Sequence, residues 1–312
     1  MRAEFPHVPK RIICATDLTA RSAPALQRAA SLSRQTGARL LMLHVIDSRQ
    51  ADRVARMQSN RAYVQLLAEA DRLFGSSADL IDVAVRRGKV RDTIASAAAE
   101  WDADLIVVAA PQPGRGSAIL GTTAERLVRT ARRSVLVVHR TMESHYGKVV
   151  IASDLSTAAL PMVRTAVRLA ALDQASATMV HAIHSPHSGM MKSAGLDESV
   201  IADFERTSLD RARLQLQSIG RDAGLIPHAR AIVTGAPPAN AILEVLERER
   251  PDLLAIGASR WFLLKRLLVG SVADRLLREA SCDVLVIPNR PAALRMGVAA
   301  TVSERVSAAS PP

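Results

Sequence analysis

Two stretches of the chain share one layout: RIICATDLTARSAPALQRAA at 11–30 and KVVIASDLSTAALPMVRTAV at 148–167. Each is an apolar run that ends in Asp-Leu, and a proline follows seven residues after the aspartate. Asp17 therefore matches Asp154, and Pro24 matches Pro161, both at a separation of 137 residues. An apolar run followed by helical spacing is typical of a strand that leads into a helix. The sequence thus contains the same strand-to-helix unit twice.

The similarity continues along both halves of the chain. His44 in LLMLHVID (40–47) corresponds to His181 in TMVHAIHS (178–185), again 137 residues later. VAVRRGKVRDTIASAAAEWDADLIVVAA (83–110) has the layout of AIVTGAPPANAILEVLERERPDLLAIGA (231–258). Near the end of each half, GTTAERLVRTARRSVLVVH (121–139) and GSVADRLLREASCDVLVIP (270–288) are identical at nine of nineteen positions. We conclude that the chain is an internal duplication.

Within each copy, short β-branched runs alternate with helical patterns, which is typical of parallel βαβ units. Crossovers of this kind are right-handed. The sequence therefore predicts an α/β protein with two tandem doubly wound domains. Each domain is expected to be an open five-stranded parallel sheet in the order 3-2-1-4-5 with helices on both faces. The predicted domains span 1–140 and 147–295, and 296–312, rich in Ala, Ser and Pro, is expected to be a mobile tail.

Composition narrows the function classes. Of the 312 residues, 48% are hydrophobic and 23% charged, and no apolar run reaches the roughly 20 residues of a membrane span. Cys14 and Cys282 lie in apolar runs and no signal sequence is recognised, so we expect a cytoplasmic protein with reduced thiols. A net charge of +11 would permit nucleic-acid contact. Because the arginines are scattered and aromatic residues are few, we expect no specific nucleic-acid partner and no membrane.

The place of a ligand site follows from the predicted fold. Ligands of open parallel sheets bind at the carboxyl edge where the strand order reverses, here between strands 1 and 4. In the second copy, the loops that meet there start at Asp154 and at Gly257. A glycine allows close approach of a ligand, and the amides at the start of the helix after Gly270 favour an anion. Asp154 could instead be a helix cap, and Ser271 with Asp274 has the spacing of a capping box.

These motifs resemble the universal stress protein family over residues 10–140 and 147–288. The resemblance rests on the strand that ends in Asp, the strand that ends in LHV, the DLIV strand closed by glycine, the Gly-Ser-Val-Ala-Asp/Glu-Arg segment and the final VLVV strand. It implies a tandem stress-response protein whose relatives are mostly cytoplasmic and often pair through the final strand. Members of the family fall into an ATP-binding group and a group that does not bind ATP. The phosphate signature of the binding group is Gly, two residues, Gly, nine residues, Gly and Ser or Thr.

The second copy keeps the spacing of that signature but has Arg260 where its second glycine belongs. Arg260 either obstructs the backbone or contacts phosphate through its guanidinium, and both alternatives stay open. The first copy departs further, with Ala109 and Gln112 at the glycine positions. We therefore expect weak binding of ATP or AMP in the second domain only. The expected site comprises Asp154 at the ribose, backbone around Ala182 near the base, and Gly257, Arg260, Gly270 and Ser271 around the phosphates.

Other motifs give weaker evidence of function. His181, His184 and His187 have a spacing that suggests zinc, but an offset of three sends His181 and His184 to opposite faces of a strand, so no metal ligand set is identified. No catalytic triad or P-loop spacing occurs, so we predict no enzyme, although slow ATP hydrolysis stays open. Two function classes remain: a nucleotide-binding regulatory protein and a nucleotide-free interaction scaffold. The two domains are expected to pair within the chain, while a homodimer and unidentified protein partners stay open.

Brief proteolysis tests the predicted domain boundaries. We expect cleavage between Arg140 and Lys148 and beyond Arg290, because these segments lie outside the predicted domains. Mass spectrometry of the resistant fragments identifies the cleavage sites. Stable fragments that end inside the predicted strand at 104–109 would contradict the domain assignment.

Overall fold

The structure is a computed structural model, and it describes most of the chain. The described residues are 9–49, 51–75, 78–110, 123–131, 133–140, 145–170, 175–184, 191, 193–225, 228–234, 237–258 and 272–288. The predicted tail at 296–312 lies outside these ranges, as do Arg260, Gly270 and Ser271.

Strands and helices alternate in both halves, as the periodicity predicts. The first half contains β1 (Arg11–Thr16), α1 (Ala23–Thr36), β2 (Arg39–Asp47), α2 (Asp52–Phe74), a short 3-10 helix (Ala78–Leu80), β3 (Ile81–Gly88), α3 (Val90–Glu100), β4 (Leu105–Ala109), α4 (Thr123–Thr130) and β5 (Ser134–Val138). The second half contains β6 (Lys148–Ala152), α5 (Ala159–Leu169), β7 (Ser176–His184), α7 (Glu198–Asp222), β8 (His228–Thr234), α8 (Pro238–Glu249), β9 (Leu253–Ala258), α10 (Val272–Glu279) and β10 (Asp283–Pro288).

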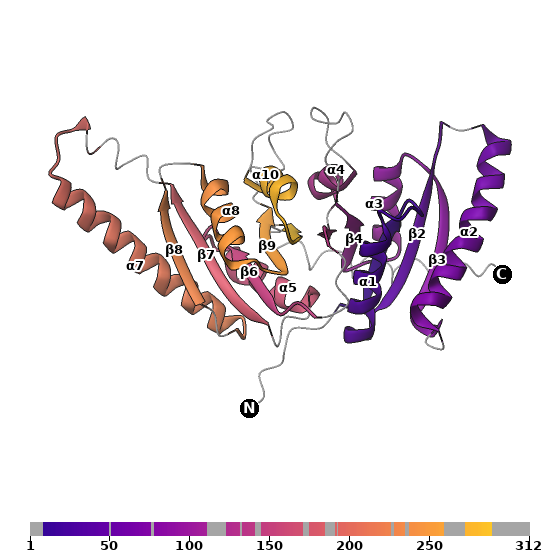
Figure 1. The fold of residues 1–312 in the computed structure, drawn as a ribbon, viewed down its shortest axis with the longest axis horizontal. Coiled ribbons are helices and arrows are strands. Elements are labelled where there is room, and N and C mark those ends of the chain that lie inside the picture. The colour runs from indigo at the N-terminus through magenta and orange to yellow at the C-terminus, as the bar shows by residue number, and fades with distance from the viewer. Residues whose placement is uncertain are drawn as a thin grey trace, which may run out of the picture.

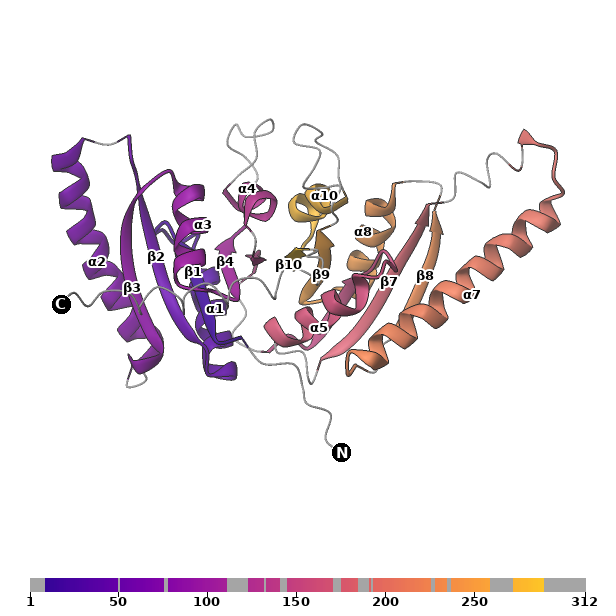
Figure 2. The ribbon, with the colours of Figure 1, turned by 180° about the vertical axis from the view of Figure 1, so that it is seen from behind.

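All ten strands form one sheet in the order β3-β2-β1-β4-β5-β10-β9-β6-β7-β8 (Figures 1 and 2). Pairing is parallel within each half and antiparallel between β5 and β10, where Val137 lies opposite Val284 and Leu136 opposite Leu285. The α/β class with a mostly parallel sheet is thus confirmed. The two sheets are not separate, because their last strands join them.

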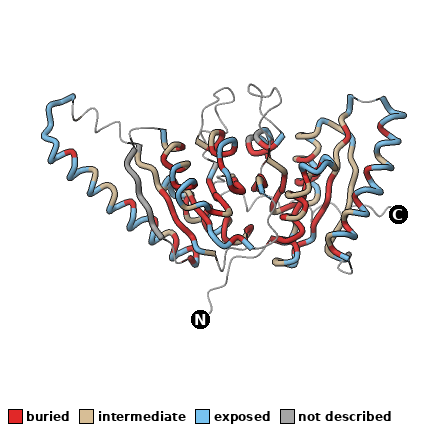
Figure 3. The backbone as a smooth tube through the Cα atoms, viewed as in Figure 1, coloured by how far each residue is buried: buried red, intermediate tan, exposed pale blue. Residues whose placement is uncertain are grey.

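Helices cover both faces of the sheet. Successive strand residues point to opposite faces, so Ile12 and Cys14 lie in one buried apolar cluster and Ile13 lies in the other. The first cluster contains residues of α1, α2, α5 and α7, and the second contains residues of α3, α4, α8 and α10. The buried residues follow the strands through the centre of both halves, while the outer sides of the helices are exposed (Figure 3).

Aspartates at the starts of strands tie neighbouring strands together. Asp104, before β4, accepts hydrogen bonds from the backbone N–H groups of Lys10 (2.7 Å) and Arg11 (3.1 Å) at the start of β1. Asp252, before β9, accepts the equivalent bonds from Gly147 and Lys148 (both 2.9 Å). The repeated aspartate is therefore a structural residue that fixes the alignment of strands 1 and 4 in each half.

A third such aspartate, Asp283, joins the two halves. One of its oxygens accepts backbone hydrogen bonds from His139 (2.9 Å) and Arg140 (3.3 Å), and the other accepts one from the Tyr146 hydroxyl (2.8 Å). Arg28 of α1 lies 3.3 Å from the same carboxylate, and both side chains are only 1% exposed. The Arg28 guanidinium also stacks 4.1 Å from the centre of the Tyr146 ring. A charged pair from opposite halves is thus enclosed at the joint.

This cluster occurs on one side of the joint only. In the repeat, the counterpart of Arg28 is Thr165 and the counterpart of Asp283 is Ser134. Burial raises the pKa of Tyr146 well above its usual value, and the negative charge of Asp283 raises it further. The Tyr146 hydroxyl therefore stays protonated and donates its hydrogen bond. The two halves therefore meet through different side chains on the two sides of an otherwise repeated structure.

The outer edges of the sheet are β3 and β8, and β3 carries charged residues in ion pairs. Arg86 pairs with Glu100 at 2.6 Å, Arg87 pairs with Asp52, and Asp82 pairs with Arg39 at 2.7 Å. Charged side chains on an edge strand disfavour the addition of another strand. Among the described helices, none combines the length and the apolar character needed to cross a membrane.

Substitution of the buried pair should be far more costly than substitution of an exposed one. Arg28→Met should lower the free energy of unfolding by about 3–5 kcal/mol, because it leaves Asp283 buried without its counter-charge. In Arg28→Met/Asp283→Asn, the loss should be smaller than the sum of the two single losses. Urea unfolding monitored by circular dichroism measures both quantities.

The pair between Arg39 and Asp82 is the matched control, because its side chains are 57% and 37% exposed. Arg39→Met should cost less than about 1 kcal/mol. Equal losses in Arg28→Met and Arg39→Met would contradict the structural importance of the joint.

Candidate functional site

The aspartate after the first strand of each half lies in a tight turn. Leu18 and Leu155, which follow these aspartates, have φ angles of 60° and 56°, a left-handed conformation that is uncommon outside glycine. The Leu18 N–H donates to Thr16 Oγ1 (3.0 Å), and the Leu155 N–H donates to Ser153 Oγ (3.2 Å). The hydroxyl residue before each aspartate thus holds the turn that positions the aspartate at the carboxyl edge of the sheet.

The repeated histidine binds the backbone of the same turn. The Nδ1 atom of His44 lies 2.9 Å from the carbonyl oxygen of Thr16, and His181 Nδ1 lies 2.8 Å from that of Ser153. A carbonyl oxygen can only accept, so Nδ1 carries the hydrogen in both rings. The His184 side chain and His187 lie outside the described residues. Within those residues, no three His, Cys, Asp or Glu side chains form a group that could hold a metal ion.

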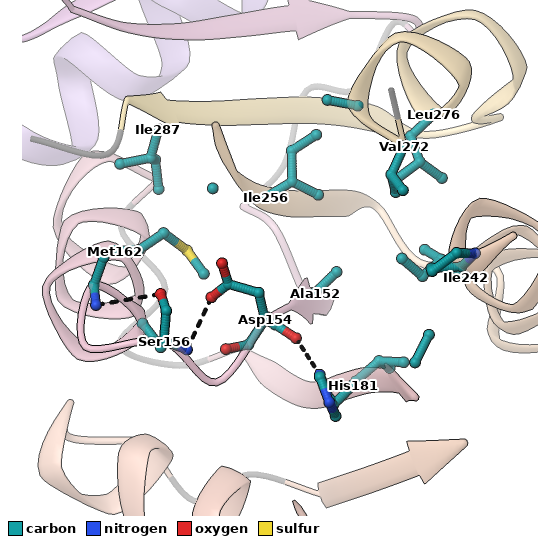
Figure 4. A pocket seen from close by; sticks show the side chains of 18 residues that line it. Ala152, Asp154, Ser156, Met162, His181, Ile242, Ile256, Val272, Leu276 and Ile287 are labelled. Atoms are coloured by element: carbon teal, nitrogen blue, oxygen red, sulfur yellow. Dashed lines mark hydrogen bonds between the residues drawn. The ribbon is translucent and has the colours of Figure 1, made fainter. Parts of the chain in front are cut away.

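A cavity of about 290 Å³ lies beside this turn in the second half. Its polar rim contains Asp154, Ser156 and His181, which lie close together on the loop after β6 and on β7 (Figure 4). Apolar side chains from α5, α8, β9, α10 and β10 line the rest: Met162, Ile242, Ile256, Val272, Leu276 and Ile287. The site can therefore hold a ligand with an apolar ring and a polar end.

Three of the six predicted site residues line this cavity: Asp154, Ala182 and Gly257. Arg260, Gly270 and Ser271 lie outside the described residues, so their predicted contacts with phosphate stay predictions. The alternative role of Asp154 as a helix cap is wrong. Helix α5 has Ala158 as its N-cap, and Asp154 instead accepts a hydrogen bond from the Ser156 N–H (3.0 Å) inside the turn.

The apolar lining could not be predicted from the sequence, because apolar residues at helical spacing are usually core residues. Met162 is the most informative of them, since it lies in the first turn of α5 next to the strand ends. A Cβ atom added to Gly257 would lie 3.5 Å from Met162 Cγ, an ordinary contact distance. Packing in the described structure would thus accept alanine at 257, so packing alone does not explain this glycine.

Comparison with known families identifies the chain. The profile of the universal stress protein family matches residues 9–139 and matches again at 145–288. The chain belongs to the universal stress protein family. A universal stress protein of Methanocaldococcus jannaschii is 28% identical over 149 residues, which cover 47% of this chain and 85% of that protein.

A solved structure of the family has the same fold. A universal stress protein from Archaeoglobus fulgidus aligns with a TM-score of 0.64 at 16% identity and covers 90% of this chain and 98% of its own. Another solved universal stress protein is in complex with cAMP; it aligns with a TM-score of 0.37 at 22% identity and covers 42% of this chain and 98% of its own. The first of these alignments thus extends over nearly the whole chain.

The histidine geometry has a spectroscopic consequence. In their neutral form, His44 and His181 should both carry the hydrogen on Nδ1, because each Nδ1 donates to a carbonyl oxygen. Long-range ¹H–¹⁵N correlation spectra distinguish this tautomer from the Nε2–H form. An Nε2–H spectrum for His181 would contradict the hydrogen bond that orients it toward the turn.

Proposed function

We propose that this universal stress protein is a regulatory protein whose second half binds an adenine nucleotide, ATP or AMP, in the cavity beside Asp154. The supporting observation is the cavity itself, about 290 Å³ at the carboxyl edge of the sheet. A carboxylate and a glycine lie at its rim, and apolar side chains line its interior. This combination suits a ligand with a flat apolar ring, hydroxyl groups and an anionic end.

Each part of the nucleotide has a counterpart in the site. The exposed Asp154 carboxylate is suited to accept hydrogen bonds from ribose hydroxyls. The apolar surface of Val180, Ile242 and Ile256 suits a base, with the backbone of Ala182 at its edge. The phosphates would lie toward Gly257, Gly270 and Ser271, with Arg260 either beside them or in their way. We assign no catalytic residue, and bound nucleotide would act by favouring one conformation of the protein.

One observation favours the alternative, a nucleotide-free interaction scaffold. Helices α2 and α7 each follow the second strand of their half, and both expose large apolar side chains. On α2, Val54 is 47% and Val64 is 65% exposed; on α7, Phe204 is 45% and Leu214 is 65% exposed. Apolar side chains exposed on a surface can contact a protein partner. This alternative requires no ligand in the cavity.

Calorimetric titration of the full-length protein with ATP, ADP and AMP tests the proposal. We expect saturable binding of one nucleotide per chain. Asp154→Ala should weaken it by roughly ten- to a hundredfold, the effect of a lost hydrogen bond to a charged group. Asp17→Ala, the matched change in the first half, should leave the affinity unchanged.

Two results would contradict nucleotide binding at this site. The wild-type protein could show no saturation at millimolar nucleotide, which would favour the scaffold. Alternatively, Asp17→Ala could weaken binding while Asp154→Ala does not, which would place the ligand in the first half.

A further inference from the structure

The two strand-end aspartates occupy the same turn but differ in their hydrogen bonds. Asp17 Oδ1 accepts three: from the Thr19 N–H (3.0 Å), the Thr19 hydroxyl (2.7 Å) and the Ser22 hydroxyl (2.9 Å). Asp154 Oδ1 accepts one within the described residues, from the Ser156 N–H (3.0 Å). A carboxylate oxygen has about two lone-pair sites, so Oδ1 of Asp17 is already saturated. Both oxygens of Asp154 retain capacity for further donors.

Ser22 is one cause of this difference. It is buried, and its Oγ lies 2.7 Å from Thr16 Oγ1, which itself accepts from the Leu18 N–H. In a consistent arrangement, Thr16 donates to Ser22 and Ser22 donates to Asp17. The counterpart of Ser22 in the second half is Ala159, which lies at the cavity and has no hydroxyl to donate.

The second difference lies at the next hydroxyl. Thr19 and its counterpart Ser156 both accept a hydrogen bond from the N–H two residues ahead, at 3.3 Å in each half. Thr19 also donates its hydroxyl to Asp17, whereas the described structure has no such bond from Ser156 to Asp154. Burial alone raises the pKa of Asp17, but the hydrogen bonds from Thr19 and Ser22 outweigh it and lower that pKa below its usual value.

We infer that Ala159 is a specificity-determining residue. Because alanine has no hydroxyl that could donate to Asp154, both carboxylate oxygens stay available for a ligand with two neighbouring hydroxyls. The inference rests on the proposed nucleotide site and deepens it. A ribose with free 2′ and 3′ hydroxyls can donate to both oxygens of Asp154 at once. A 2′-deoxyribose can donate to only one. In the first half, Thr19 and Ser22 together already occupy Oδ1 of Asp17, so that carboxylate cannot be used in the same way.

The substitution Ala159→Ser tests this directly, and the fold accepts serine at the equivalent position of the first half. With AMP and 2′-deoxy-AMP as probes, the wild type should bind AMP roughly tenfold more tightly, the effect of one hydrogen bond to a charged group. Ala159→Ser should weaken AMP binding by roughly the same factor and leave 2′-deoxy-AMP binding unchanged. Ser22→Ala is the matched control and should change neither affinity.

Carboxylate titration by ¹³C NMR provides a readout that needs no ligand. Ser22→Ala should raise the pKa of Asp17, because the Ser22 hydroxyl stabilises the charged form of that carboxylate. An unchanged melting temperature for Ala159→Ser would show that the fold is intact.

The outcomes separate this inference from the proposed function. Equal weakening of AMP and 2′-deoxy-AMP by Ala159→Ser, or no weakening of either, would overturn the role of Ala159. A wild type that binds neither nucleotide would overturn the proposed function instead. In that case, an Asp17 pKa that Ser22→Ala leaves unmoved would overturn the hydrogen-bond difference on which the inference stands.

Discussion

The antiparallel pairing of β5 with β10 is the constraint on which the rest of this protein depends. Val135, Leu136 and Val137 on one strand and Val284, Leu285 and Val286 on the other are almost completely buried. An isolated half would expose one of these edges to water, with its unpaired backbone groups. The strand pairing buries both edges, and Asp283 extends it by bonding the backbone beyond the end of β5. Because both partners belong to one chain, dilution does not separate them.

Much of this fold could be predicted from the sequence because the same alternation of strand and helix patterns occurs in both halves. Helical spacing and β-branched runs that recur in the same order in both halves predict a parallel α/β protein. The details of the joint could not be predicted in the same way. Arg28 and Asp283 lie in opposite halves, and their proximity follows from the strand pairing. The signal in the sequence was a break in the repeat, since Thr165 and Ser134 occupy the equivalent positions.

The candidate site was only partly accessible to sequence reasoning. The rule for ligand sites in parallel sheets selected Asp154 and Gly257, and both line the cavity. The apolar lining was missed because Met162 and Ile242 have the spacing of ordinary core residues. The difference between Ser22 and Ala159 was also missed, since serine and alanine at a helix start look equivalent until the positions of Thr16, Thr19 and Asp17 are known. Conversely, the aspartates at 104 and 252 that recur in the repeat have a structural role.

The ion pairs along β3 also bear on how the molecule behaves among its own copies. A ten-stranded sheet whose central edges are joined within the chain can grow only at its two ends. At the β3 edge, a strand from another copy of the chain would have to disrupt the ion pairs of Arg86 with Glu100 and of Arg87 with Asp52. During synthesis or in concentrated solution, this edge is therefore a poor template for edge-to-edge aggregation of chains.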